Sequence, residues 1–194
     1  MKHFLITLSV LLFSGLAMAQ QGIKDFTILD ASTQKEVSLY QYKSKKAIVI
    51  IFMGNFCPYT KLYHERIKAL EEKYKNDEVA FILINPNTQG GHPDESPAET
   101  VRIAQEEGFK SQVWIDRNQA AIKVLNPSKT PECFVLDQGV KNELRIAYRG
   151  AIDDNPQVEG DVSSAYLADA IAAVLAGRNP KEPNTRPTGC LIKK

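Results

Sequence analysis

The sequence predicts an α/β domain in which helices cover both faces of a central sheet. First, the run from Ala47 to Met53 is apolar at every position, which is typical of a strand buried on both faces. Second, strand-like and helix-like segments alternate, with connections long enough for parallel crossovers. Third, 194 residues are enough for one domain with a substantial core.

The predicted elements follow in order along the chain. A strand pair around a Ser-Thr turn precedes the buried strand, and a capping box at Ser96 and Glu99 starts the second long helix. The predicted strands are residues 25–31, 36–42, 47–53, 79–84, 113–116, 132–137 and 144–148. The predicted helices are residues 58–75, one that begins at 96–97, then 119–125 and 163–176.

The first 19 residues have the pattern of a secretory signal peptide. Lys2 precedes an apolar stretch from Phe4 to Ala17, and Ala17-Met18-Ala19 supplies small residues at a cleavage spacing. The stretch is short for a spanning helix, so an uncleaved anchor is the weaker alternative. We therefore expect a signal peptide at 1–19, a folded domain at 20–177 and a C-terminal tail at 178–194, in a secreted or periplasmic protein.

The charge balance argues against two classes of partner. The chain has 24 Lys and Arg residues against 23 Asp and Glu residues. It therefore lacks the basic excess with which proteins bind nucleic acids or anionic membranes. We expect no nucleic-acid partner and, once the signal peptide is removed, no membrane partner.

Cys57 is the main candidate for chemistry. It follows the buried strand and a polar turn, and Pro58 follows it at the first position of the predicted helix. A thiol there faces unpaired backbone N–H groups and the positive end of the helix dipole, which favour the thiolate. We expect a partly exposed, reactive thiol; the alternative is an inert small side chain beneath a turn.

Two more cysteines, Cys133 and Cys190, complete the set of three. Their wide spacing provides no set of zinc ligands, so we expect no metal and no cofactor. Cys133 lies inside an apolar strand and is expected in the core. Cys190 lies in the proline-rich tail, which is long enough to reach most of the surface. It is either a resolving thiol for Cys57 or a thiol without a role.

Three landmarks resemble one known group of proteins when taken in order. Cys57-Pro58 follows a strand, Thr130-Pro131 directly precedes another, and the segments 148–154 and 186–193 close the chain. Together they resemble the thioredoxin-like superfamily, in its redoxin or peroxiredoxin-like (AhpC/TSA-type) branch. The resemblance covers roughly residues 25–194. It implies a thioredoxin-like fold, with a mixed sheet and a strand–helix insertion after the active-site helix.

The resemblance also shows where this chain departs from its relatives. Cys-Pro-Tyr-Thr is similar to the Cys-x-x-Cys motif with Thr60 in place of the second cysteine, which excludes local dithiol chemistry. The Thr60 hydroxyl would instead donate to the Cys57 thiolate and lower its pKa. The peroxiredoxin pattern Pro-x-x-x-Thr/Ser-x-x-Cys does not match either, because Gly54 and Ile50 occupy the hydroxyl and proline positions.

By the same resemblance, the Thr130–Pro131 bond is cis and lies against Cys57. In the superfamily this arrangement presents the backbone before the proline for pairing with a bound peptide. We accordingly assign substrate binding to Thr130, Pro131 and Asn55, and catalysis to Cys57, Thr60 and Cys190.

Three function classes remain open at this point. The first is a thiol–disulfide oxidoreductase of the monothiol type, in which Cys57 is resolved by Cys190, a partner protein or a small thiol. The second is a peroxiredoxin-like antioxidant in which peroxide oxidises Cys57. The third is a binding module that kept the fold without the chemistry. Protein or small-molecule thiols and disulfides, with an external reductant, are the expected partners.

Overall fold

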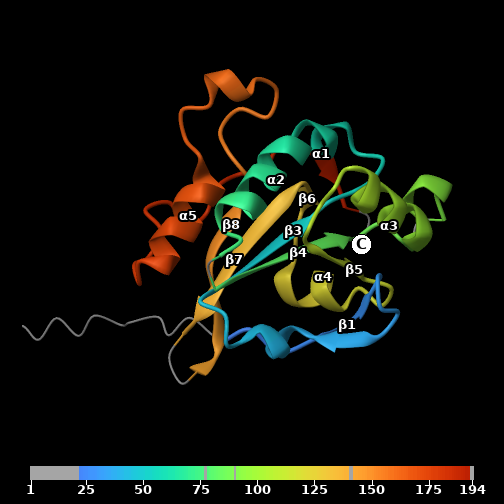
Figure 1. Ribbon diagram of the computed structural model, residues 1–194, viewed down its shortest axis with the longest axis horizontal. Helices are drawn as coiled ribbons and strands as arrows, with labels where there is room; N and C mark the ends of the chain where they lie inside the picture. The colour runs from blue at the N-terminus through green and yellow to red at the C-terminus, as the bar shows by residue number, and fades with distance from the viewer. Residues whose placement is uncertain (1–21, 77, 90, 140–141, 193–194) are drawn as a thin grey trace, which may run out of the picture.

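A computed structural model describes residues 22–76, 78–89, 91–139 and 142–192. Its centre is a seven-stranded mixed sheet with helices on both faces, as the sequence predicts (Figure 1). The proposed signal peptide at 1–19 lies outside the described residues. A second, two-stranded sheet forms near the C-terminus.

The strands and helices have the following bounds. The seven-stranded sheet contains β1 (Thr27–Asp30), β2 (Glu36–Ser38), β3 (Ala47–Phe52), β4 (Val79–Asn85), β5 (Gln112–Ile115), β7 (Glu132–Gln138) and β8 (Leu144–Gly150). The small sheet pairs β6 (Lys129–Thr130) with β9 (Cys190–Leu191). The helices are α1 (Pro58–Leu62), α2 (His64–Lys73), α3 (Pro97–Glu106), α4 (Ala120–Leu125) and α5 (Tyr166–Leu175).

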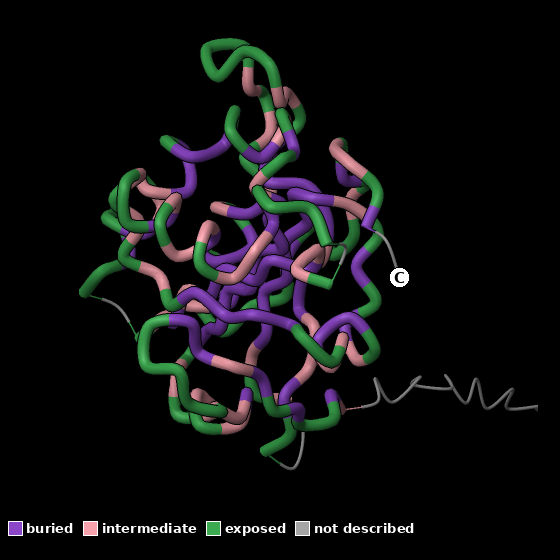
Figure 2. Tube along the Cα trace, turned by 90° about the vertical axis from the view of Figure 1, so that its right-hand side faces the viewer, coloured by how far each residue is buried: buried purple, intermediate pink, exposed green. Residues whose placement is uncertain are grey.

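The sheet has the order β2-β1-β5-β4-β3-β7-β8. Strands β3, β4 and β5 are parallel, whereas β7, β8, β1 and β2 join in antiparallel pairs. Every residue of β3 is buried, which explains its unbroken apolar sequence. The buried strands form the middle of the molecule in Figure 2, and the exposed segments surround them.

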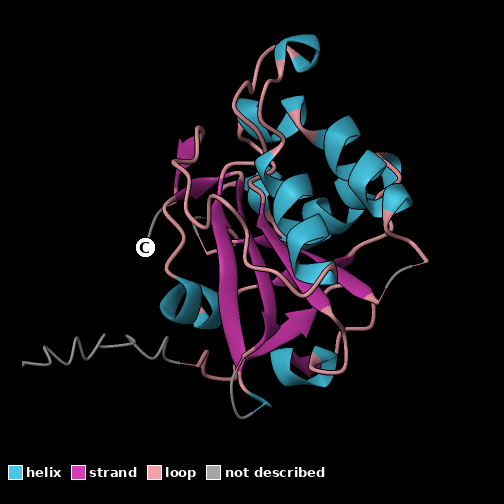
Figure 3. Cartoon of the chain, turned by 90° about the vertical axis from the view of Figure 1, so that its left-hand side faces the viewer, coloured by secondary structure: helices cyan, strands magenta, loops and turns pink. Residues whose placement is uncertain are grey.

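Alternate residues of the central strands contribute to different cores. On one face, Val49 and Ile51 pack with residues of α2 and α5. On the other face, Ile48 and Ile50 pack with residues of α4 and with Ile192 from the tail. This alternation follows from the two-residue period of a strand, and it places helices on both sides of the sheet (Figure 3).

The predicted helix over 58–75 is divided in two. Tyr63 ends α1 and precedes α2, and its N–H bonds to the carbonyl of Thr60, three residues back, at 3.0 Å. This tight bonding ends the first helix after five residues. The Tyr63 ring is buried, and its hydroxyl donates to Asp153 at 2.9 Å. A tertiary contact of the ring therefore accompanies the break, and no proline or glycine marks it.

Other boundaries differ from the predicted ones by a few residues. The second predicted strand ends at Ser38, and a short 3-10 helix (Leu39–Tyr42) takes its remaining residues. The predicted cap of α3 is present, since the Ser96 hydroxyl accepts the N–H of Glu99 at 3.2 Å. Helix α5 begins at Tyr166, three residues after the predicted start at Ser163.

Candidate functional site

Cys57 lies where the central strand β3 passes into helix α1. Its N–H bonds to the carbonyl of Gly54 at 3.2 Å, which closes the turn between strand and helix. Pro58 then occupies the first helical position, where a missing N–H costs nothing. Cys57 is only 3% exposed, so the expectation of a partly exposed thiol is wrong for this state. The neighbouring Phe56, by contrast, is 64% exposed.

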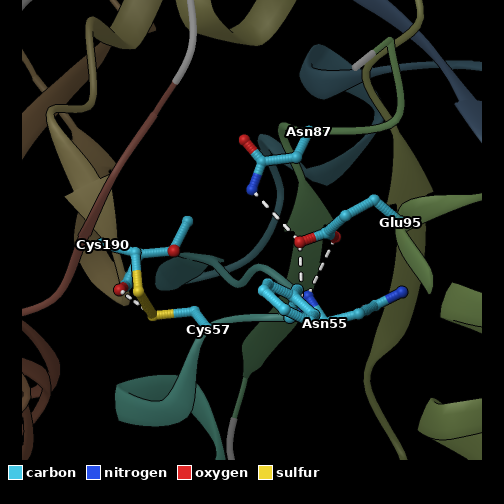
Figure 4. The surroundings of a disulfide bond; sticks show 7 residues. Asn55, Cys57, Asn87, Glu95 and Cys190 are labelled. Atoms are coloured by element: carbon cyan, nitrogen blue, oxygen red, sulfur yellow. Dashed lines mark hydrogen bonds between the residues drawn. A yellow bond between two sulfur atoms is a disulfide. The ribbon is translucent and has the colours of Figure 1, made fainter. Parts of the chain in front are cut away.

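The structure joins Cys57 to Cys190 in a disulfide (Figure 4). The two residues are 133 positions apart in the sequence, and their Cα atoms are 5.9 Å apart. Cys190 reaches this place because β9 pairs antiparallel with β6, with Cys190 opposite Thr130. The sequence alone left open whether Cys190 pairs with Cys57. The pairing of β9 with β6 brings the two cysteines together.

The tail passes directly over the Thr130–Pro131 bond, which is cis as predicted. The Cys57 sulfur lies 3.0 Å from the carbonyl oxygen of Thr130, which places this bond against the disulfide. A Cβ atom on Gly189 would overlap that carbonyl and would lie 3.2 Å from the Pro131 nitrogen. Only glycine fits at this position of the tail, directly before Cys190.

Ile192 anchors the end of the tail. Its side chain is buried in the core on the α4 side of the sheet, and its N–H bonds to the Ser128 carbonyl at 3.2 Å. Leu191, between this anchor and Cys190, is 77% exposed. This alternation of exposed and buried side chains is typical of a strand. Cys190 is therefore held between Gly189, which lies against Thr130, and the buried Ile192.

The landmark segment 148–154 bonds at β8 to the part of the tail just before the second landmark segment. The N–H of Arg149 bonds to the Pro183 carbonyl and the N–H of Thr185 bonds to the Arg149 carbonyl, both at 3.0 Å. The Thr185 side chain lies 2.6 Å from the Tyr148 hydroxyl and accepts the N–H of Ala151 at 2.9 Å. The predicted tail is therefore extended, but it is docked along the edge of the domain.

Glu95 is a site residue that sequence reasoning missed. Its buried carboxylate accepts the backbone N–H groups of Asn55 at 3.0 Å and Phe56 at 3.1 Å. The side chain of Asn85 also donates to it, at 2.8 Å. So does the side chain of Asn87, at 3.4 Å (Figure 4). Glu95 thus holds the loop that carries Cys57. Its place at the end of a polar loop gave no signal, because the loop residues that it holds, Asn55 and Phe56, lie 40 and 39 residues away.

Glu132 plays the corresponding part on the tail side. This buried carboxylate follows Pro131 and accepts the N–H groups of Ser128 at 2.6 Å and Lys129 at 3.3 Å. Arg149 donates to its other oxygen at 2.9 Å. Glu132 therefore fixes the strand on which the tail docks. A charged residue at the start of an otherwise apolar strand was the available signal.

The remaining predicted site residues surround the disulfide in different ways. The Asn55 side chain donates to the Asp94 carbonyl at 2.8 Å and to Thr100 at 2.9 Å, so both of its N–H groups are engaged within the protein. Thr60 is buried, and within the described residues its hydroxyl has no hydrogen-bond partner. A contact of Asn55 with substrate and a bond from Thr60 to a Cys57 thiolate both stay predictions.

Cys133 belongs to the core, as predicted. It is fully buried in β7, with its sulfur 3.1 Å from the carbonyl of Gly150. Burial raises the pKa of its thiol well above the ordinary value, with a further contribution from Glu132. The thiolate is therefore strongly disfavoured, and Cys133 takes no part in the disulfide.

The described part of the chain contains no group of three His, Cys, Asp or Glu residues that could hold a metal ion. Among the described helices, none combines the length and apolar character needed to cross a bilayer. An opening of about 190 Å³ borders the disulfide, and its lining includes Phe56, His92 and Leu191.

Comparisons with known proteins support the fold. The chain is similar to a hypothetical protein from Sinorhizobium meliloti 1021, with 27% identity, a TM-score of 0.79 and coverage of 92% of this chain and 96% of that one. It is also similar to an uncharacterised conserved protein from Geobacillus kaustophilus, with 28% identity, a TM-score of 0.80 and coverage of 91% and 92%.

A more distant likeness concerns the fold alone. A protein proposed as the thiol:disulfide interchange protein DsbE of Chlorobium tepidum has 13% identity and a TM-score of 0.59, with coverage of 81% of this chain and 97% of that one. No curated protein sequence matches the chain. The redoxin family model matches residues 18–166, which is most of the chain, and the protein therefore belongs to the redoxin family.

Proposed function

We propose that this protein is a thiol–disulfide oxidoreductase whose redox pair is Cys57 and Cys190. The observation that carries the proposal is the disulfide between the turn after β3 and the docked tail. Thr60 cannot resolve a mixed disulfide, and Cys190 supplies the missing second thiol from elsewhere in the chain. The proposal therefore replaces a monothiol mechanism with a two-cysteine mechanism.

The proposed reaction has two exchange steps. The Cys57 thiolate attacks one sulfur of a substrate disulfide, forms a mixed disulfide with it and releases the other substrate sulfur as a thiolate. The Cys190 thiolate then attacks the Cys57 sulfur, which forms the internal disulfide and releases the second substrate thiolate. Two electrons pass from the protein to the substrate, and an external thiol reductant restores both cysteines.

Access to Cys57 requires that strand β9 moves away from it in the reduced protein. Cys57 is buried while Cys190 lies opposite Thr130, so the tail and a substrate segment cannot occupy this place together. The tail thus lies where the superfamily resemblance puts an extended substrate. Protein segments that contain a disulfide are accordingly the proposed substrates.

The proposed location is secreted or periplasmic. A disulfide that is remade in each cycle suits an oxidising compartment with a dedicated reductant. The apolar N-terminal segment supports the same location. A fusion of residues 1–21 to a reporter enzyme that is active only after export tests it; activity confined to the cytoplasm contradicts it.

Reduction of insulin disulfides with dithiothreitol as electron source tests the function. We expect the wild-type protein to accelerate reduction, Cys57→Ser to lose the acceleration, and Cys190→Ser to accumulate mixed disulfides on Cys57. Cys133→Ser is the control and should keep the activity. A wild-type rate equal to that without protein contradicts the proposal. Consumption of hydrogen peroxide without insulin reduction would favour the peroxidase class.

A further inference from the structure

The two cysteines of the disulfide differ in their exposure to solvent. Cys57 is 3% exposed, and its sulfur lies 3.0 Å from the Thr130 carbonyl, beneath the docked tail. Cys190 is half-buried and belongs to a two-residue strand at the surface. The next residue, Leu191, is 77% exposed. A reagent in solution therefore meets the Cys190 side of the bond first.

The surface beside Cys190 is open. The opening of about 190 Å³ is lined by both cysteines and extends to Phe56 and His92, whose rings lie 4.8 Å apart. Of the described residues that line it, none is Lys or Arg, and the one carboxylate, Glu95, is buried and held by its donors. A thiolate can approach here without meeting an exposed acidic group.

Cys57 borders the same opening, but it is almost entirely covered. Gly189 lies against Thr130 and Pro131, and Glu95 holds the loop before Cys57 through two backbone N–H groups. The incoming, central and leaving sulfurs must lie roughly in line during thiol–disulfide exchange, so access decides which sulfur is attacked. An attack on Cys57 would have to reach a residue that is 3% exposed, while the disulfide still holds the tail beside it.

We infer that a thiol reductant attacks the oxidised protein at the sulfur of Cys190, and that Cys57 is the leaving group. This inference rests on the proposed function, which names the pair but not the sulfur that receives electrons. The reductant thiolate forms a new S–S bond to Cys190, and the bond between Cys190 and Cys57 breaks with its electron pair on Cys57. A second reductant thiolate then attacks the reductant sulfur of this mixed disulfide. The Cys190 thiolate is released, and the two reductant sulfurs are left joined in a disulfide.

The consequence is a fixed direction of electron flow through the site. Electrons enter at Cys190, and the first thiolate freed is Cys57, which is the group that attacks substrate. Cys190 thereby has two roles, since it resolves the substrate complex and later receives the reductant.

Early-time mapping of a mixed disulfide tests the inference. The oxidised wild-type protein is mixed with glutathione, quenched with acid at a series of short times and alkylated, and its peptides are analysed by mass spectrometry. The amounts of the two mixed disulfides are extrapolated to zero time. We expect the form with glutathione on Cys190 and alkylated Cys57 to exceed the form with glutathione on Cys57 and alkylated Cys190 by about tenfold or more. The same reaction in guanidinium chloride is the control, because unfolding exposes both sulfurs and should remove most of this preference.

The outcomes separate this inference from the proposed function. Adducts that form mainly on Cys57, or equally on both cysteines in the native protein, overturn the inference. The proposal that Cys57 and Cys190 are the redox pair is unaffected by that result. Failure of the native disulfide to exchange at all, while the unfolded control reacts, overturns both.

Discussion

The Cys57 loop and the C-terminal tail meet at one disulfide, but they are held in place differently. The loop connects the central strand β3 to helix α1, and the Glu95 carboxylate binds two of its backbone N–H groups. The tail is held by a two-residue strand, by Thr185 and by buried residues that include Pro187 and Ile192. The loop is thus fixed by the fold itself, whereas the position of Cys190 depends on a few contacts and on the disulfide.

The largest expected effect comes from opening the disulfide. The bond closes a loop of 133 residues, and its loss should lower the free energy of unfolding by about 2–4 kcal/mol. Denaturant unfolding of the oxidised and reduced wild-type protein measures this difference. In Cys190→Ser, the reductant should change nothing. Equal stability of the two wild-type forms would mean that the tail adds no constraint.

A neighbouring pair of residues tests the anchor of the tail. Ile192→Ala removes a buried side chain and should lower the free energy of unfolding of the oxidised protein by about 2 kcal/mol, the low end for a core truncation. Leu191→Ala, at an exposed position, should change it by less than about 0.5 kcal/mol. Similar values for the two variants would show that Ile192 is no anchor.

A smaller effect is expected on the loop side. Glu95→Ala leaves the N–H groups of Asn55 and Phe56 without their acceptor and should lower the free energy of unfolding by about 1–2 kcal/mol. The reduced variant should also react faster with iodoacetamide at Cys57, because the loop is less firmly held. Asp94→Ala is the matched control, since the Asp94 side chain is exposed. If Glu95→Ala behaves like this control, the carboxylate does not position the loop.

The same contrast explains what the sequence predicted well. The central strands, the capped start of α3 and the position of Cys57 depend on apolar runs and on neighbouring residues, and these elements were predicted from the sequence. The cis bond before Pro131 came from the resemblance to a known superfamily. The strands, the helix cap and the position of Cys57 are encoded within short segments, so a single sequence is sufficient to find them.

The features that sequence reasoning missed depend on distant contacts. The burial of Cys57 results from a tail 133 residues away, and the role of Glu95 results from a loop 40 residues away. The break at Tyr63 accompanies a bond to Asp153, 90 residues later. Neither propensity nor periodicity contains such contacts, since both describe neighbours along the chain.

The most direct test of the central claim is a peptide map of the protein purified without reductant, with free thiols alkylated before digestion. The account predicts one linked peptide pair that contains Cys57 and Cys190, with Cys133 unmodified until the protein is unfolded, because burial raises the pKa of its thiol. Treatment with dithiothreitol should separate the pair, and mild oxidation should restore it. A map that links Cys57 only to other molecules, with Cys190 free, would contradict the account.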